Sequence, residues 1–281
     1  MDTLHIFQQY LDILTATRRL EPVTAAHFPE PVMVGAVGGS GSRLVVSVLE
    51  ELGIMMAPYG NRGKDSVLWP PMERITDSMA ARHNSREVLV SHAFRVLEEL
   101  WLQYQKRQSL SAPVGLKIPA SFLWLPELAS FFPSLRYLFI VRNGLDMAFS
   151  SNQAQFSTYS WYFGINGRDL REPPAKRVPE SRMLDYWLAA NAYAIEQGRR
   201  HLGDRFHILD YDRLCLAPGE QIQALLEFLG ADASRAERLA SLVKPPESIG
   251  RHRNFPWQEV FSAAQLREYE RVTKLASMEW Q

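Results

Sequence analysis

A glycine- and serine-rich loop, Gly38–Ser42, follows an apolar run at Val32–Val37 and precedes a helical pattern at Arg43–Leu52. Its glycines let the main chain turn with positive φ and approach a ligand closely, and its serines add hydroxyl donors. The following helix would direct its free N–H groups and the positive end of its dipole into the loop. Such an arrangement binds phosphate without any long side chain. The sequence therefore predicts a phosphate-binding loop at this position.

The loop departs from the two commonest nucleotide-binding patterns. The pattern G-x-x-x-x-G-K-[ST] needs a lysine after its last glycine for the β- and γ-phosphates, and then a hydroxyl for Mg²⁺. Here Gly41 is followed by Ser42 and Arg43, and Ala36 stands five residues before it. The dinucleotide pattern G-x-G-x-x-G is absent as well. A phosphotransferase that uses a nucleoside triphosphate is therefore disfavoured and is kept as a third hypothesis.

Strand-like runs alternate with helical patterns along the chain, which is typical of a parallel sheet with helices on both faces. In such sheets, ligands bind beyond the carboxyl ends of the strands. Lys117, Arg142 and Tyr211 each stand at or just past the end of such a run, as the glycine loop does. The expected strands are Val32–Val37, Val114–Ile118, Tyr137–Val141 and Phe206–Leu209, and the expected helices are Arg43–Leu52, Glu87–Gln105, Phe122–Phe132, Leu145–Asn152, Met183–His201 and Glu220–Leu229.

Length and composition indicate one elaborated domain over residues 1–281, since a chain with 46% apolar residues can bury a full core. Basic and acidic residues number 31 each, so no global field attracts nucleic acid. No apolar run approaches the ~20 residues of a membrane span, and the single cysteine, Cys215, excludes a disulfide framework. We expect a cytoplasmic protein with an N-terminal helical extension at residues 1–30. The aromatic-, Gly- and Pro-rich residues 156–180 are expected to form a long loop that lines the substrate site.

Four motifs in order resemble the sulfotransferases that use 3′-phosphoadenosine-5′-phosphosulfate (PAPS). Gly39–Leu44, GSGSRL, is similar to the family's loop for the 5′-phosphosulfate, and Phe139–Ser150, FIVRNGLDMAFS, is similar to its 3′-phosphate motif. Ile208–Leu229 and Ser248–Phe255, SIGRHRNF, resemble two later family segments. Any one of these motifs is a weak signal, whereas four in the family's order are specific.

The resemblance implies a three-layer α/β sandwich of the P-loop-NTPase-like sulfotransferase fold, with a central, mostly parallel sheet. It implies an enzyme that moves a sulfonyl group from PAPS to a hydroxyl or amine of a small-molecule or carbohydrate acceptor, with no metal. A homodimer is a further expectation. The residues that the resemblance implies for donor binding are Gly39, Ser40, Gly41, Ser42, Arg43, Leu44, Arg142, Ser150, Tyr211, Arg251 and Arg253.

Arg142 and Ser150 are expected to hold the 3′-phosphate, the group that distinguishes PAPS from ATP. The planar guanidinium of an arginine grips a phosphate through two parallel hydrogen bonds. The alternative interpretation is that Arg142 forms an ion pair with the aspartate four residues later, and that Ser150 is merely helical. Core packing is the alternative for Tyr211, and a solvated basic loop is the alternative for Arg251 and Arg253.

Two positions depart from the family pattern. The loop cation that contacts the transferred group is replaced by Gly39, although fixed positive charge there contributes strongly to catalysis. Arg43 is a candidate to supply this charge. The family's K-T-H segment reads Lys117-Ile118-Pro119, so the catalytic candidate Lys117 is kept and the histidine is absent. These departures motivate a second hypothesis, a donor-binding scaffold of the same fold without turnover.

The base that takes the proton of the acceptor must then come from elsewhere, from within about 3 Å of the reacting hydroxyl. Asp65, in the loop Asn61–Trp69, is the first candidate, and a solvated aspartate beside Lys64 is its alternative. His92 is the second candidate, but it lies off the apolar stripe of its helix, which is typical of a surface histidine. No partner pattern accompanies His83, His201, His207 and His252, and no His/Asp/Glu spacing indicates a metal site.

Overall fold

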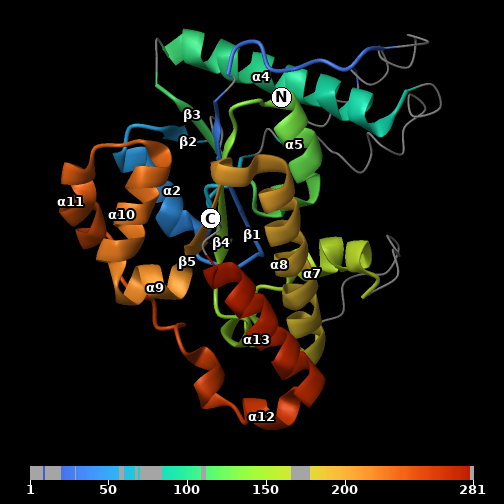
Figure 1. The fold of residues 1–281 in the computed structure, drawn as a ribbon, viewed down its shortest axis with the longest axis vertical. Coiled ribbons are helices and arrows are strands. Elements are labelled where there is room, and N and C mark those ends of the chain that lie inside the picture. Colours follow the sequence, from blue (N-terminus) through green and yellow to red (C-terminus); the bar gives the residue numbers. More distant parts are fainter. Residues whose placement is uncertain are drawn as a thin grey trace.

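The computed structural model describes residues 9, 20–28, 30–56, 60–66, 69, 84–108, 112–165 and 178–278. Its centre is one sheet whose strands all run parallel in the order β2-β3-β1-β4-β5 (Figure 1). The strands are β1 (Val32–Ala36), β2 (Met55–Met56), β3 (Val114–Lys117), β4 (Arg136–Val141) and β5 (Phe206–Asp210). The four predicted strands are confirmed to within one residue at each end. The edge strand β2, with two residues, is too short to leave a pattern in the sequence.

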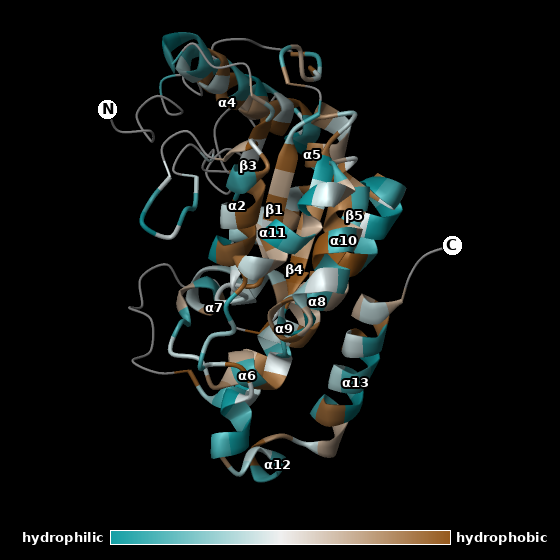
Figure 2. Cartoon of the chain, turned by 90° about the vertical axis from the view of Figure 1, so that its left-hand side faces the viewer, coloured by the Kyte–Doolittle hydropathy of each residue, from teal (hydrophilic) through white to brown (hydrophobic). Residues whose placement is uncertain are grey.

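Side chains of the central strands alternate between two apolar cores, one on each face of the sheet. Val34 and Ile140 belong to one core, and Met33 and Phe139 to the other. Figure 2 shows the strands in brown, enclosed by helices whose outer faces are teal. The first core is covered by α2 (Ser42–Glu51), α9 (Tyr211–Leu216), α10 (Pro218–Leu229) and α11 (Ala236–Ser241), and the second by α4 (Arg86–Gln108), α5 (Leu125–Phe131), α8 (Glu180–Leu202) and α13 (Ala263–Ser277). The predicted three-layer α/β fold is confirmed.

The short elements gather at the carboxyl ends of the strands. They are α6 (Gly144–Ala148), α7 (Ala154–Tyr159), the 3₁₀ turns η3 (Ser160–Phe163) and η6 (Arg251–Asn254), and α12 (Trp257–Val260). Figures 1 and 2 both show α12 beyond this end of the sheet, whereas α4 lies across the opposite end. The short elements therefore surround the end of the sheet where the glycine loop lies, and α4 does not.

Three expected elements are corrected by the structure. The helix expected over Phe122–Phe132 begins as an α-helix only at Leu125, and Pro119–Trp124 form the 3₁₀ helix η2. The helix expected over Leu145–Asn152 ends at Ala148, because the next residue, Phe149, leaves the helix and stacks on Phe255 with 4.4 Å between ring centroids. The expected loop 156–180 begins instead as the helical segment α7–η3, whose Phe156 is buried against α8. Residues 166–177 of that loop lie outside the described residues.

Residues 20–28 belong to the expected N-terminal helical extension, but the structure shows no helix there. This segment lies across α4, where the fully buried carboxylate of Glu98 accepts hydrogen bonds from the backbone N–H groups of Ala26, His27 and Phe28 at 2.7–3.0 Å. Hydrogen bonds to side chains satisfy backbone groups that a helix would otherwise pair internally. Apart from Gln9, residues 1–19 lie outside the described part of the chain.

Candidate active site

The glycine loop joins β1 to α2, and two of its three glycines have the positive φ that the sequence predicts, whereas Gly38 does not. Gly39 and Gly41 have φ angles of 93° and 81°. Gly41 is the N-cap of α2, and no side chain caps this helix or adds an acidic group in its first turn. The hydroxyl of Ser40 donates to the carbonyl oxygen of Val37 at 2.6 Å, so it closes the loop upon itself. The N–H of Leu44 donates to the carbonyl oxygen of Gly41 at 3.0 Å, whereas the N–H groups of Ser42 and Arg43 have no hydrogen-bond partner among the described residues and are available to an anion.

Tyr211 packs directly against Gly41. It is the first residue of α9, immediately after β5, and a Cβ added to Gly41 would lie only 2.0 Å from its ring. Burial is the main cause that raises the pKa of Tyr211 to about 12, so its hydroxyl is neutral at physiological pH. Position 41 therefore needs glycine both for its left-handed backbone and for this close approach.

We expect Gly41→Ala to lower the melting temperature by roughly 5–15 °C, because it combines backbone strain with a collision against Tyr211. Left-handed strain costs about 1–3 kcal/mol, and each kcal/mol corresponds to roughly 2–4 °C in a chain of this size. Gly53→Ala is the matched control, since Gly53 has a φ of 84° but nothing within 4 Å of an added Cβ. Equal losses in the two variants, measured by calorimetry, would show that Tyr211 yields without cost.

Arg142 links three separate parts of the site. Its Nη1 donates to the carbonyl oxygen of Gly39 at 3.1 Å, and its Nη2 donates to the carbonyl and hydroxyl oxygens of Ser248, both at 2.8 Å. The guanidinium carbon lies 5.3 Å from the ring centroid of Tyr211. The residue is only 8% exposed, and its Nε is buried without a hydrogen-bond partner among the described residues. The arginine thus faces the glycine loop and keeps its Nε–H donor unused.

The expected alternative for Arg142, an ion pair with Asp146, is not what the structure shows. The carboxylate of Asp146 instead accepts hydrogen bonds from the backbone N–H of Gly250 at 2.6 Å and of His252 at 2.9 Å. It also contacts Nδ1 of His252 at 2.6 Å. His252, which shows no partner pattern in the sequence, therefore has a buried carboxylate as its partner.

The backbone around Arg142 is fixed from both sides. The indole of Trp187, on α8, donates to the carbonyl oxygen of Arg142 at 3.1 Å. The N–H of Asn143 donates to the carboxylate of Asp212 at 2.7 Å, and this bond ties the end of β4 to the start of α9. Burial is the largest cause that raises the pKa of Asp212. These contacts limit the positions that the Arg142 side chain can reach.

Lys117 and Asp65 form a second group at the end of β3. Their side chains are ion-paired, and Nζ of Lys117 also donates to the carbonyl oxygen of Gly63 at 2.7 Å. The Lys117 side chain is 4% exposed and that of Asp65 is 34% exposed, so the pair is open to solvent on the side of the aspartate. Lys64 pairs with Glu50 instead. The structure thus brings two of the predicted catalytic residues together, and Asp65 is not merely solvated beside Lys64.

Four further predicted binding residues make few side-chain contacts with the described part of the chain. Ser150 follows the end of α6, and its hydroxyl accepts a hydrogen bond from the N–H of Asn152 at 3.2 Å. Arg43 is exposed in the first turn of α2. Arg251 and Arg253 lie on η6, and neither has an ion pair with a described carboxylate. The three arginines therefore remain available to an anionic ligand.

The structure does not bring His92 to this end of the sheet. It lies on α4, across the opposite end (Figure 1), where its Nε2 contacts the carbonyl oxygen of Glu21 at 3.0 Å. This contact fits its expected alternative, a surface histidine, and the helix that carries it has no place beside the glycine loop. His83 lies outside the described residues.

Gln155 is a site residue that the sequence did not indicate. Its side-chain oxygen accepts a hydrogen bond from the N–H of Gly38, and its amide nitrogen donates to the carbonyl oxygen of Ala36 at 3.2 Å. Through this pair of bonds, α7 is attached to the glycine loop. No local signal could reveal it, because the partners lie 117 and 119 residues apart in the sequence.

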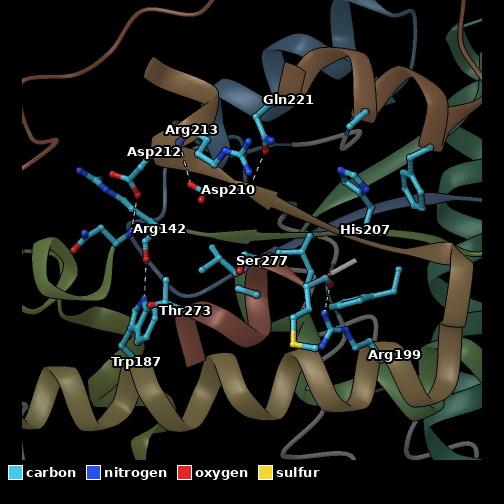
Figure 3. Close-up of a pocket in the computed structure, with 18 of the residues that line it drawn as sticks. Arg142, Trp187, Arg199, His207, Asp210, Asp212, Arg213, Gln221, Thr273 and Ser277 are labelled. Carbon is cyan, nitrogen blue, oxygen red and sulfur yellow. Dashed lines mark hydrogen bonds between the residues drawn. The ribbon is translucent and has the colours of Figure 1, made fainter. Parts of the chain in front are cut away.

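A cavity of about 750 Å³ opens beside the edge strand β5, between α8, α10 and α13 (Figure 3). Arg142 and Trp187 stand at one end of it, and Arg199 and His207 stand toward the other. No residue of the glycine loop lines this cavity. The cavity borders the candidate site at Arg142, which lines it and donates to the carbonyl oxygen of Gly39.

Within the described ranges, no cluster of three His, Cys, Asp or Glu side chains is placed to hold a metal ion. The described helices include none with the length and apolarity that crossing a membrane requires.

Comparison with known proteins identifies the family. The model of the Sulfotransferase family matches residues 31–235. Nodulation protein H of Rhizobium tropici is 25% identical over 219 residues, which cover 76% of this chain and 81% of that protein. A solved sulfotransferase domain from the olefin synthase of Synechococcus PCC 7002 is 14% identical, with a TM-score of 0.50 over 94% of this chain and 99% of that one, and supports the fold. Since the family model covers most of the chain, the protein belongs to the sulfotransferase family and is a sulfotransferase.

Proposed function

We propose that this sulfotransferase uses PAPS as its sulfonyl donor. The contact pattern of Arg142 carries the proposal, because the guanidinium faces the glycine loop and its Nε–H is buried without an acceptor among the described residues. Leaving a buried charged donor unpaired is costly, so a bound anion would supply what the fold omits. The uncapped first turn of α2 offers a second anion site.

The two anion sites suit the two phosphate ends of the donor. The loop Gly39–Leu44 and the N-terminus of α2 would hold the 5′-phosphosulfate. Arg142, with Ser150, Arg251 and Arg253, would hold the 3′-phosphate. Tyr211, which packs between Gly41 and Arg142, would contact the nucleotide between these ends.

The transfer itself needs positive charge and a base. An oxygen or nitrogen of the acceptor attacks the sulfur, the bond from sulfur to the bridging phosphate oxygen breaks, and adenosine 3′,5′-bisphosphate (PAP) leaves. We propose that Lys117 stabilises the negative charge that develops on the bridging oxygen, with Arg43 as a further cation. We propose that Asp65 accepts the proton of the acceptor. A side chain at position 39 is disfavoured by its positive φ and by Met147, whose methyl group lies 3.2 Å from an added Cβ. The missing loop cation is thus consistent with the local packing.

We propose a hydroxyl or amine of a small molecule or carbohydrate as the acceptor. Tyr159, Trp161, Tyr162 and Phe163, on α7 and η3, are all half-buried aromatic residues. Gln155 attaches this aromatic segment to the glycine loop. Aromatic faces suit both phenols and sugars. A cytoplasmic location, a homodimer and the absence of a nucleic-acid partner stay predictions.

Binding of PAP tests the donor assignment. At 100 times its dissociation constant, a specific ligand stabilises a protein by about 2.7 kcal/mol, so we expect PAP to raise the melting temperature by at least 5 °C. Transfer of labelled sulfonate from PAPS to a panel of phenols, amines and sugars then tests turnover. No shift with saturating PAP would reject PAPS as the donor. A PAP shift without transfer to any acceptor would favour the scaffold, and Mg²⁺-dependent consumption of ATP would favour the phosphotransferase.

A further inference from the structure

A C-terminal stretch of chain is held against α6 by one buried carboxylate. This closing segment, residues 248–254, includes η6 and two arginines. Asp146 accepts hydrogen bonds from the N–H of Gly250 and the N–H of His252, and it contacts Nδ1 of His252, at 2.6–2.9 Å. Only 1% of Asp146 and 8% of His252 is exposed. Hydrogen bonds to an ionised carboxylate are among the strongest in proteins, and burial protects them from solvent.

Aromatic contacts hold the chain on the far side of the closing segment. The ring of His252 lies edge-on to Trp257, with 5.7 Å between centroids, and Phe255 stacks on Phe149. Arg142 holds the near side through Ser248. The backbone around Arg251 and Arg253 is therefore fixed at both ends, although these two side chains have no ion pair with a described carboxylate.

We propose that Asp146 and His252 are positioning residues that hold Arg251 and Arg253 in place for the 3′-phosphate of the donor. This inference rests on the proposed use of PAPS. Arg142 alone cannot keep the segment docked, because its contact with Ser248 uses donors that a bound phosphate would compete for. Asp146 lies on α6, four residues after Arg142. Among the described residues its carboxylate contacts only the backbone N–H groups of Gly250 and His252 and the ring of His252, so it stays engaged when Arg142 turns to the phosphate.

Asp146→Asn tests this role, because the side chain keeps its volume but one of its two oxygens becomes an NH₂ group. That NH₂ group faces a backbone N–H of the segment and cannot accept its hydrogen bond. We expect the affinity for PAP to fall about tenfold while the affinity for adenosine 5′-phosphate stays within twofold. Hydrogen exchange of residues 248–254 should become faster. A second pair of variants supports the test: His252→Asn keeps a donor near the position of Nδ1 and should retain more PAP affinity than His252→Leu.

Glu98→Gln is the matched control, because Glu98 is another buried carboxylate that holds a chain segment, at residues 26–28. It should speed exchange there and leave the affinity for PAP within twofold. Equal losses of PAP and adenosine 5′-phosphate binding in Asp146→Asn would overturn the proposal, as would faster exchange at 248–254 without loss of PAP affinity. If Asp146→Asn does not fold, the affinities of His252→Asn and His252→Leu for PAP and for adenosine 5′-phosphate provide the same test. A wild-type protein that binds no PAP rejects the donor itself, whereas unchanged exchange in Asp146→Asn rejects the positioning role alone.

Discussion

Arg142→Ala is expected to weaken the binding of PAP at least 100-fold. The variant removes a guanidinium that faces the glycine loop and has a buried, unpaired Nε–H. Each hydrogen bond to a charged group contributes about 1.5–3 kcal/mol, and two such bonds to the 3′-phosphate give about 3–6 kcal/mol. Since each 1.4 kcal/mol is about a factor of ten in affinity, a 100-fold loss is the lower bound. Isothermal titration calorimetry with PAP measures it.

Arg136→Ala provides the matched control for this variant. Arg136 lies at the opposite end of the same strand, β4, and donates to the carbonyl oxygen of Leu229. Its loss should lower stability but change the affinity for PAP less than threefold. Arg142→Lys should recover only part of the affinity, because a lysine keeps the charge but not the planar pair of donors. If Arg142→Ala binds PAP as the wild type does, the 3′-phosphate lies elsewhere.

Local signals sufficed to predict the loop and four of the five strands that the structure describes. Apolar runs such as Val32–Val37 are long and continuous because both faces of a central parallel strand are buried. The end of each run marks where a predicted ligand-binding residue emerges, and Lys117, Arg142 and Tyr211 do end or follow β3, β4 and β5. A parallel sheet places these ends at one edge without any knowledge of side-chain contacts.

The contacts within the site depend on tertiary structure, and the sequence does not contain a local signal for them. Asp146 and His252 lie 106 residues apart, and nothing near either of them indicates the other. The early end of α6 has the same origin, since Phe149 leaves the helix for aromatic partners at Phe255 and Phe261. By contrast, α13 did have a usable signal, because Ser262 and Gln265 form a capping box at its start.

Lys117→Met is expected to lower the rate of sulfonyl transfer by about 100- to 1000-fold, the range observed when one group that stabilises developing charge is removed. Lys117 is the buried cation at the end of β3, and the position of the family's loop cation is occupied by Gly39. Because the charge on the bridging oxygen develops in the transition state, the affinity for PAP should change less than fivefold. The initial rate of labelled transfer, with any acceptor that the wild type uses, measures the effect.

Lys64→Met is the matched control for Lys117→Met, since the Lys64 ammonium contacts Ser47 and Glu50 on α2 and its loss should lower the rate less than twofold. Asp65→Asn then separates two roles of its carboxylate. If Asp65 takes the acceptor's proton, kcat falls as far as in Lys117→Met and the pH dependence of the rate changes. If it only orients Lys117 through their ion pair, the loss is about tenfold and the pH profile keeps its shape. A Lys117→Met enzyme with undiminished transfer would leave Arg43 as the cation of the reaction and remove the pair at β3 from the mechanism.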